Sequence, residues 1–201
     1  LEGEPANVER QGLMDPRFRL SVLLYGAPAL SPREFAESPR SNTVIGMGLS
    51  IKAPLGEYFD NKLINLGQNR WIIRPELGIT HTRGRWTYEL TGSIFFFTDN
   101  DSFYQGTTLE NDPLFALQGH VIYEFRPGLW ASLSTAYGDG AEPTISGVPK
   151  DAATENWLGA LSIGIPISRR QGIKLSYLRT RTQVPTGADM DTIALGYQTM
   201  F

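Results

Sequence analysis

The feature that most constrains this chain is an alternation of apolar and polar side chains with a period of two, which runs along almost its whole length. In one stretch the apolar positions are Trp86, Tyr88, Leu90, Ile94 and Phe96, and mostly threonine, glutamate and serine lie between them. A period of two places successive side chains on opposite faces of a β-strand, whereas a helix needs a period of about 3.6. The sequence therefore predicts an all-β protein.

Nine segments of the chain share this pattern. They lie at residues 17–25, 44–52, 71–80, 86–96, 115–125, 129–137, 157–165, 173–177 and 191–201. Most are about as long as the roughly 9–11 residues that a tilted membrane-spanning strand needs, and longer than the roughly 5–6 residues usual in soluble proteins. We therefore predict an antiparallel up-and-down transmembrane β-barrel, with its apolar face toward lipid and its polar face toward a lumen. In the alternative, a soluble β protein, residues such as Leu49, Leu90 and Val121 would lie in a dry core.

Aromatic residues gather at the ends of the predicted strands rather than at their middles. This placement is typical of the two interfaces of a bilayer, where an aromatic ring lies between hydrocarbon and water. The predicted interface aromatics are Trp71, Trp86, Tyr123, Phe125, Tyr137, Trp157 and Phe201.

The connections between the predicted strands alternate between long and short from the second one onward. Outer-membrane barrels combine short periplasmic turns with longer outer loops. With a periplasmic C-terminus, segments 54–70, 98–113, 138–156 and 182–189 become the outer connections, and most acidic residues lie in or beside them. These acids indicate either ordinary solvated loops or an acidic mouth that favours cations or binds lipopolysaccharide through divalent ions.

The first connection, residues 26–42, departs from this alternation because it is long and falls on the periplasmic side. It contains Ser31, Pro32 and Glu34, which together form a capping-box signature. We expect one or two helical turns there.

Ionisable residues on the polar face suit a wet lumen. They form either a constriction that selects solutes by charge or a salt-bridge ladder that fills a narrow barrel. Phe95 and Phe97 share the lumen parity near the outer rim, where they provide either a sliding surface for an aromatic solute or ordinary rim packing. The candidate selectivity residues are Arg17, Arg19, Lys52, Arg74, Glu76, Glu89, His120, Glu124 and Lys174.

An odd number of strands is unusual, because bacterial single-chain barrels use even numbers. Residues 1–14 are too polar and too rich in glycine and proline to supply another strand. We expect residues 1–201 to form a single barrel domain in which 1–14 are the remnant of an outer loop, with upstream strands and a signal peptide missing. The sheet should then be an open arc with an unpaired edge at Arg17–Tyr25.

Little in the composition points to chemistry. The net charge of -3 leaves no basic excess to neutralise a nucleic acid. With no cysteine and two histidines, the chain offers no thiolate or His-rich metal site, and we expect no cofactor and no enzymatic activity. A tight turn at 126–128 places His120 opposite Ser134, which predicts either a lumen hydrogen bond or, as the less favoured alternative, the Ser–His pair of a barrel lipid hydrolase.

Several phrases of the sequence together resemble one family. They are "DPRFRLSVLLYGAPAL", "NRWIIRPELGI", "FFFTDND", "LQGHVIYEF", "GLWASLSTAYGDG" and "DTIALGYQTMF". The chain resembles the MetA-pathway phenol degradation family over about residues 12–201. The resemblance implies an outer-membrane β-barrel transporter that passes small compounds, aromatic ones among them. Phe201 resembles the terminal signal read by the outer-membrane assembly machinery.

Taken together, the residues favour a passive outer-membrane channel for small molecules. Its expected partners are outer-membrane lipids and lipopolysaccharide, the barrel assembly machinery through Phe201, and the solute itself, without nucleic acid. The alternative function is a structural or adhesive barrel with a plugged lumen, whose acidic loops act outside.

Overall fold

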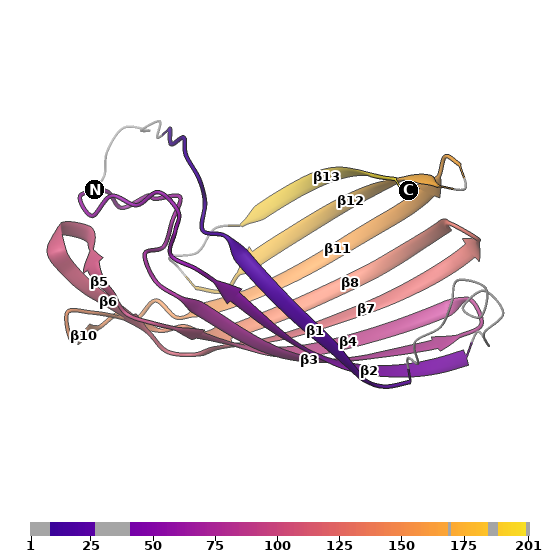
Figure 1. Ribbon diagram of the computed structural model, residues 1–201, viewed down its shortest axis with the longest axis horizontal. Helices are drawn as coiled ribbons and strands as arrows, with labels where there is room; N and C mark the ends of the chain where they lie inside the picture. Colours follow the sequence, from indigo (N-terminus) through magenta and orange to yellow (C-terminus); the bar gives the residue numbers. More distant parts are fainter. Residues whose placement is uncertain (1–8, 27–40, 169, 185–188, 200–201) are drawn as a thin grey trace.

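The computed structural model describes residues 9–26, 41–168, 170–184 and 189–199. Its main element is one antiparallel sheet in the order β1-β2-β3-β4-β7-β8-β11-β12-β13 (Figure 1). These strands are β1 (Arg17–Tyr25), β2 (Ser41–Lys52), β3 (Ile72–Arg83), β4 (Trp86–Phe97), β7 (Leu114–Arg126), β8 (Leu129–Gly140), β11 (Thr154–Pro166), β12 (Gln171–Thr182) and β13 (Met190–Thr199). Each pairs with the next long strand along the chain, so the predicted up-and-down order and the nine long strands are confirmed.

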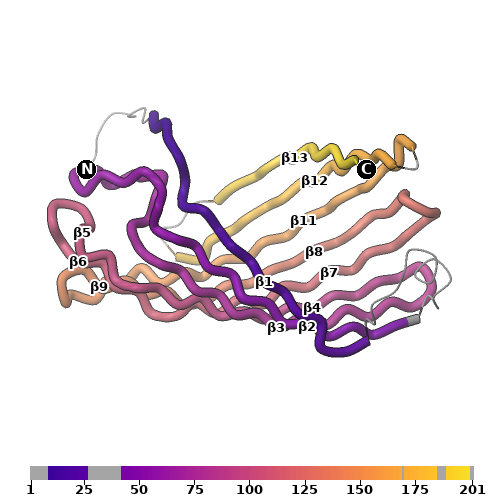
Figure 2. The backbone as a smooth tube through the Cα atoms, viewed as in Figure 1, coloured from indigo at the N-terminus to yellow at the C-terminus, as the bar shows by residue number. Residues whose placement is uncertain are grey.

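A second, small sheet lies at one end of the first, and the sequence pattern did not predict it (Figures 1 and 2). Its order is β10-β9-β6-β5, and its strands come from two of the predicted outer loops. They are β5 (Asn100–Phe103), β6 (Thr107–Asn111), β9 (Pro143–Ile145) and β10 (Val148–Pro149), with the 3-10 turn η1 (Tyr104–Gly106) between β5 and β6. Pairing of β6 with β9 joins the two loops to each other.

The two ends of the large sheet differ in their connections (Figure 1). One end, here called the loop end, carries the small sheet and segment 53–71. The opposite end, called the turn end, carries short hairpins such as Pro127–Gly128 between β7 and β8. Gly128 has a φ of 80°, and proline followed by a residue with positive φ is the signature of a type II turn. The helical turn predicted around Ser31 lies outside the described residues.

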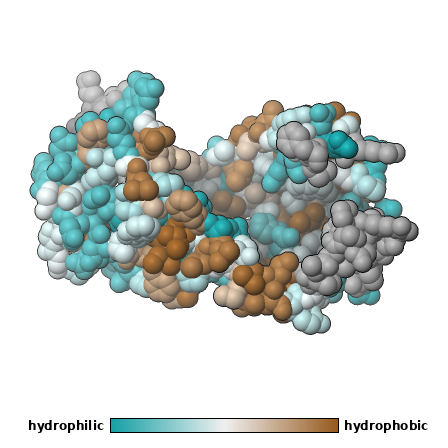
Figure 3. Space-filling view, viewed as in Figure 1, coloured by the Kyte–Doolittle hydropathy of each residue, from teal (hydrophilic) through white to brown (hydrophobic). Residues whose placement is uncertain are grey.

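The outward face of the sheet is apolar and exposed, so the fold has no conventional core. The only buried hydrophobic residue in the described ranges is Ala53, which is 2% exposed. Leu49, Leu90 and Val121 are 39%, 49% and 36% exposed. Figure 3 shows brown hydrophobic surface across the middle of the molecule and mainly hydrophilic surface at the loop end. This arrangement contradicts the soluble alternative, which required those side chains in a dry centre.

The large sheet does not close on itself within the described chain. Strand β1 pairs only with β2, and β13 pairs only with β12. The prediction of an open arc with a free edge at Arg17–Tyr25 is therefore confirmed. Among the described residues, no helix combines the length and the hydropathy needed to cross a membrane.

Two buried polar side chains fix the path of the segment between β2 and β3. The first is Asp15, whose Oδ1 accepts from the Gly56 N–H at 2.9 Å and whose Oδ2 accepts from the Gln68 N–H at 2.8 Å. The same carboxylate lies 3.5 Å from Nζ of Lys52. These contacts fasten both arms of the segment to the chain just before β1.

The second is Asn100, the first residue of β5, which is 1% exposed. Its Oδ1 accepts from Asn69 Nδ2 at 2.8 Å and from the Ser102 N–H at 3.1 Å. Its Nδ2 donates to the Tyr58 hydroxyl at 3.0 Å and to the Gln68 carbonyl at 3.2 Å. One amide therefore joins the small sheet to segment 53–71.

Replacing this amide should loosen the loop end without unfolding the large sheet. Asn100→Ala leaves several polar partners unsatisfied, at a cost of about 1–3 kcal/mol, and loops open independently of a stable scaffold. We expect tryptic cleavage after Lys62 to become about tenfold faster or more. Asn61→Ala, at an exposed asparagine without a hydrogen bond to a described residue, is the control. Equal cleavage rates in the two variants would contradict this role.

Candidate functional site: the polar face of the sheet

All nine predicted selectivity residues lie on the face opposite the exposed apolar side chains. Residues paired across neighbouring strands share a face, and the registers connect these positions in rows, such as Arg19↔Ser50↔Arg74 and Glu89↔His120↔Ser134. Their placement on one face was predictable, whereas their grouping required the structure. The residues of this face are Arg17, Arg19, Lys52, Arg74, Glu76, Glu89, His120, Glu124 and Lys174.

Five of these residues gather on strands β1 to β3. Glu76 is the centre of an ion-pair group, because its carboxylate contacts the Arg19 guanidinium and lies 3.7 Å from Arg74 Nε. The Glu76 side chain is only 9% exposed. It lies over Gly48 of β2, where an added Cβ would come within 2.6 Å of the carboxylate oxygen. Glycine therefore gives this large side chain room to lie flat along the sheet.

The turn end of the polar face repeats this arrangement with an aromatic residue. Trp130 of β8 lies over Gly164 of β11, where an added Cβ would overlap the indole ring. The Nζ atom of Lys174 lies 5.9 Å from the centroid of this ring, within the range of a cation–π interaction. Glu124 is in register with Trp130 on the neighbouring strand.

His120 and Ser134 meet as the hairpin turn predicted. His120 Nδ1 and Ser134 Oγ are 2.7 Å apart. Glu89 is in register with His120 on its other side, but it makes no hydrogen bond to the ring. A Ser–His–carboxylate site uses the histidine Nε2 toward the serine and a carboxylate hydrogen-bonded to Nδ1. Here Nδ1 of His120 faces the serine instead, and Glu89 does not bond to the ring, so the pair does not have the geometry of such a site. It is a hydrogen bond across two strands of the polar face.

A pocket of about 420 Å³ opens on the polar face at the loop end. We call it the basic pocket and define it by Arg17, Lys52, Arg70, Arg74, Phe95 and Phe97. The Arg70 guanidinium carbon lies 4.6 Å above the Phe97 ring, and that of Arg74 lies 4.6 Å above the Phe95 ring. The two phenylalanines, which sequence analysis placed near the outer rim on this face, thus support two arginines.

Arg70 is a site residue that sequence analysis missed, because it falls in a predicted loop. The alternation of the sequence nevertheless indicated its position. Even-numbered residues of β3 lie on the polar face, and Arg70, two residues before Ile72, has the same parity. Its Nη1 donates to Oδ1 of Asn111 in β6. Burial lowers the pKa of Arg70 from the usual value of an arginine, while Asp99 and Tyr58 act in the opposite direction. An arginine with such a high starting pKa stays charged at neutral pH.

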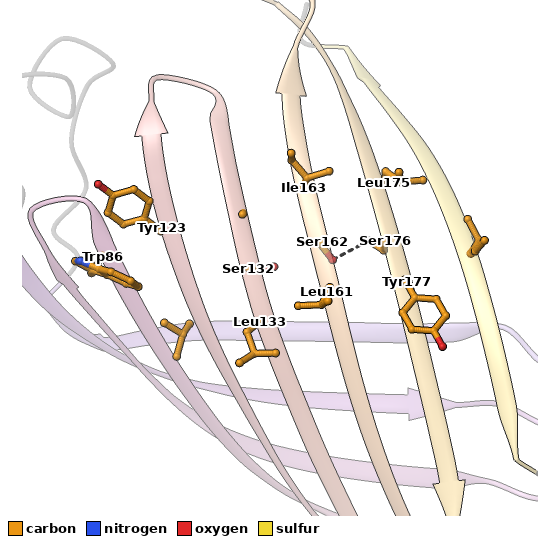
Figure 4. A pocket seen from close by; sticks show the side chains of 13 residues that line it. Trp86, Tyr123, Ser132, Leu133, Leu161, Ser162, Ile163, Leu175, Ser176 and Tyr177 are labelled. Carbon is orange, nitrogen blue, oxygen red and sulfur yellow. Dashed lines mark hydrogen bonds between the residues drawn. The ribbon is translucent and has the colours of Figure 1, made fainter.

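Another hollow lies on the opposite, apolar face. It measures about 840 Å³, and its lining includes Trp86, Leu133, Leu161 and Tyr177 (Figure 4). Ser162 and Ser176 hydrogen-bond to each other at 2.8 Å across β11 and β12 beneath it. A hollow lined this way on an outward face suits hydrocarbon chains better than a polar solute.

The predicted interface aromatics form contacts at both ends of the apolar face. At the turn end, the ring centroids of Trp86 and Tyr123 are 4.7 Å apart, and those of Tyr123 and Phe125 are 5.0 Å apart. Toward the loop end, the Tyr137 and Trp157 centroids are 4.6 Å apart. The remaining two behave differently: Trp71 is exposed just before β3, and Phe201 lies outside the described residues.

The described ranges hold no group of three or more His, Asp or Glu side chains arranged to bind a metal ion.

The sheet, with one apolar and one polar face, has the barrel fold of a known outer-membrane channel, although it is not closed within the described chain. The crystal structure of the COG4313 outer membrane channel from Pseudomonas putida F1 superimposes with a TM-score of 0.76 at 20% sequence identity. The match covers 92% of this chain and 65% of that chain. The family described as "Putative MetA-pathway of phenol degradation" matches residues 1–183. The chain belongs to this family, so the predicted resemblance is confirmed. Comparison with curated proteins returns no match.

The ion-pair group should contribute to stability through Glu76. Glu76→Gln leaves the mostly buried Arg74 without its carboxylate, which should lower the free energy of unfolding by about 1–3 kcal/mol once the exposure of Arg19 is allowed for. Urea unfolding of the protein in lipid vesicles measures this change. Glu89→Gln, on the same face but without an ion pair to a described residue, should change it by less than about 0.5 kcal/mol. If both variants lose the same free energy of unfolding, the charge of Glu76 contributes no more than that of Glu89. The Glu76 side chain would then act by packing alone, which glutamine preserves.

Proposed function

We propose that the protein is a passive channel of the outer membrane, which carries small molecules down a concentration gradient along the polar face of its sheet. The observation that carries this proposal is the division of one continuous sheet into two faces. Large apolar side chains are exposed on one face, and ionisable side chains lie on the other. Such a sheet is stable only with hydrocarbon outside and water inside. The family match and the fold of the COG4313 channel support the same role.

The loop end faces outward and the turn end faces the periplasm in this proposal. Longer loops on the outer side and short turns on the inner side are typical of outer-membrane barrels. In a bilayer, the free backbone groups of β1 and β13 have to be paired as well, because hydrocarbon offers them no partner.

Charged residues on the apolar face support this orientation by marking where hydrocarbon ends. On β12 the outward positions change from Leu175 and Tyr177 to Arg179 and Arg181 toward the loop end. Arg181 lies 3.4 Å from Asp189 and from Asp191. These groups would lie at the level of the lipid headgroups, where lipopolysaccharide is the proposed partner.

The proposed transport involves no covalent chemistry. The His120–Ser134 pair acts as a structural hydrogen bond, for the geometric reasons given above. Phe95 and Phe97 on the solute path favour a solute with an aromatic or other planar apolar part.

The small sheet at the loop end favours one alternative, a structural barrel whose outer loops close the mouth. Planar-bilayer recording of the natural protein separates the two functions. A channel gives discrete conductance steps that scale with salt concentration, whereas a plugged barrel gives none. Protein unfolded in urea before addition is the control for leakage. Absence of steps from correctly folded protein would overturn the proposal.

A further inference from the structure

We propose that the basic pocket is a binding site for the carboxylate of an aromatic acid, which makes organic anions the preferred solutes of the channel. This inference rests on the proposed channel function and specifies the solute class of the same polar face.

The first argument is the charge of the lining. Four cationic side chains line the pocket, and none of its lining residues is acidic. Two carboxylates lie close behind: Asp15 is 3.5 Å from Lys52, and Glu76 is 3.7 Å from Arg74. Arg17 has no ion pair with a described residue, and the acid that acts most strongly on Arg70 is Asp99, in a loop. The pocket therefore keeps a positive excess, which attracts anions and repels cations.

The second argument is the geometry of the two arginines. Each guanidinium is stacked on a phenylalanine ring, Arg70 on Phe97 and Arg74 on Phe95. Stacking uses the flat face of a guanidinium and leaves its N–H donors free in the plane, where a carboxylate can accept two at once. The Nε atoms of Arg70 and Arg74 are shielded from solvent and have no hydrogen-bond partner in the described chain, so a carboxylate would accept from the terminal Nη groups. The rings thus hold two donor groups in place before any solute arrives.

The third argument concerns the rest of the pocket. Ile72 and Leu114 line it together with the two phenylalanines. A carboxylate alone would leave this apolar surface in contact with water, whereas a ring attached to the carboxylate would cover it. Partial burial of Arg70, which also lowers its pKa, strengthens its attraction for an anion by reducing the local dielectric screening. An aromatic carboxylate satisfies both parts of the site.

The test uses single-channel recording of the natural protein with three probes. Benzoate carries both features, benzylammonium has the ring with the opposite charge, and acetate has the charge without the ring. We expect benzoate to reduce the current at a concentration about tenfold lower than either of the others, because charge-assisted hydrogen bonds and ring contact act together. Equal potency of benzoate and benzylammonium would overturn the inference and leave the channel function standing.

Variants locate the site. Arg70→Gln/Arg74→Gln should raise the half-blocking benzoate concentration about tenfold or more. Arg85→Gln removes an exposed cation from the turn between β3 and β4, outside the pocket, and should change the half-blocking concentration less than about twofold. Arg74→Lys keeps the charge but loses the planar fork, so weaker block by this variant distinguishes carboxylate recognition from simple attraction. Unchanged block by the double variant would refute the site; if that variant does not insert, the single Arg70→Gln variant takes its place.

A second measurement covers the case in which the protein shows no conductance. Equilibrium dialysis of benzoate against the detergent-solubilised protein tests binding without transport. Binding that the double variant loses would support the pocket even though the channel function had failed. No binding in that case would refute both.

Discussion

Backbone pairing is the constraint on which the rest of this structure depends. In hydrocarbon every N–H and C=O needs a partner from the protein, so strands must pair along their whole length. The nine long strands pair with their neighbours in one antiparallel sheet, with irregularities in β1 and β7 and with open edges at β1 and β13 within the described residues. Successive side chains of a paired strand point to opposite faces of the sheet. The pairing that stabilises the large sheet therefore also separates its apolar face from its polar face.

The loop end is held together by hydrogen bonds of single polar side chains rather than by the pairing of long strands. Asp15 and Asn100 tie segment 53–71 to the start of β1 and to the small sheet. Arg70 lies at the end of this segment, so its place above Phe97 depends on those two anchors. The outer loops are rich in acids, yet the pocket below them is lined by cations. Acidic loops and a basic pocket thus lie at the same end of the sheet.

The large sheet was predictable from the sequence because a period of two is a local property. The parity of Phe95 and Phe97 and the meeting of His120 with Ser134 follow from counting residues across a tight turn. The small sheet was not predictable, because its strands are too short to show a period and pair across distant loops. Arg70 was missed because it falls in a predicted loop, although the parity of β3 extends to it.

The open edges were also expected, since the odd number of strands and the polar start of the chain pointed to them. What sequence could not give was the grouping of charges around Glu76. Which guanidinium reaches this carboxylate depends on the stagger of β1 against β2 and β3, and that stagger is fixed by the whole ladder.

Two glycines on the polar face influence the width of the proposed channel. Glu76 and Trp130 lie flat because Gly48 and Gly164 have no side chain beneath them. Adding a single methyl group at either glycine would tilt a carboxylate or an indole away from the wall and into the water-filled space. In the proposed channel, a substitution this small would narrow the passage without changing any charge.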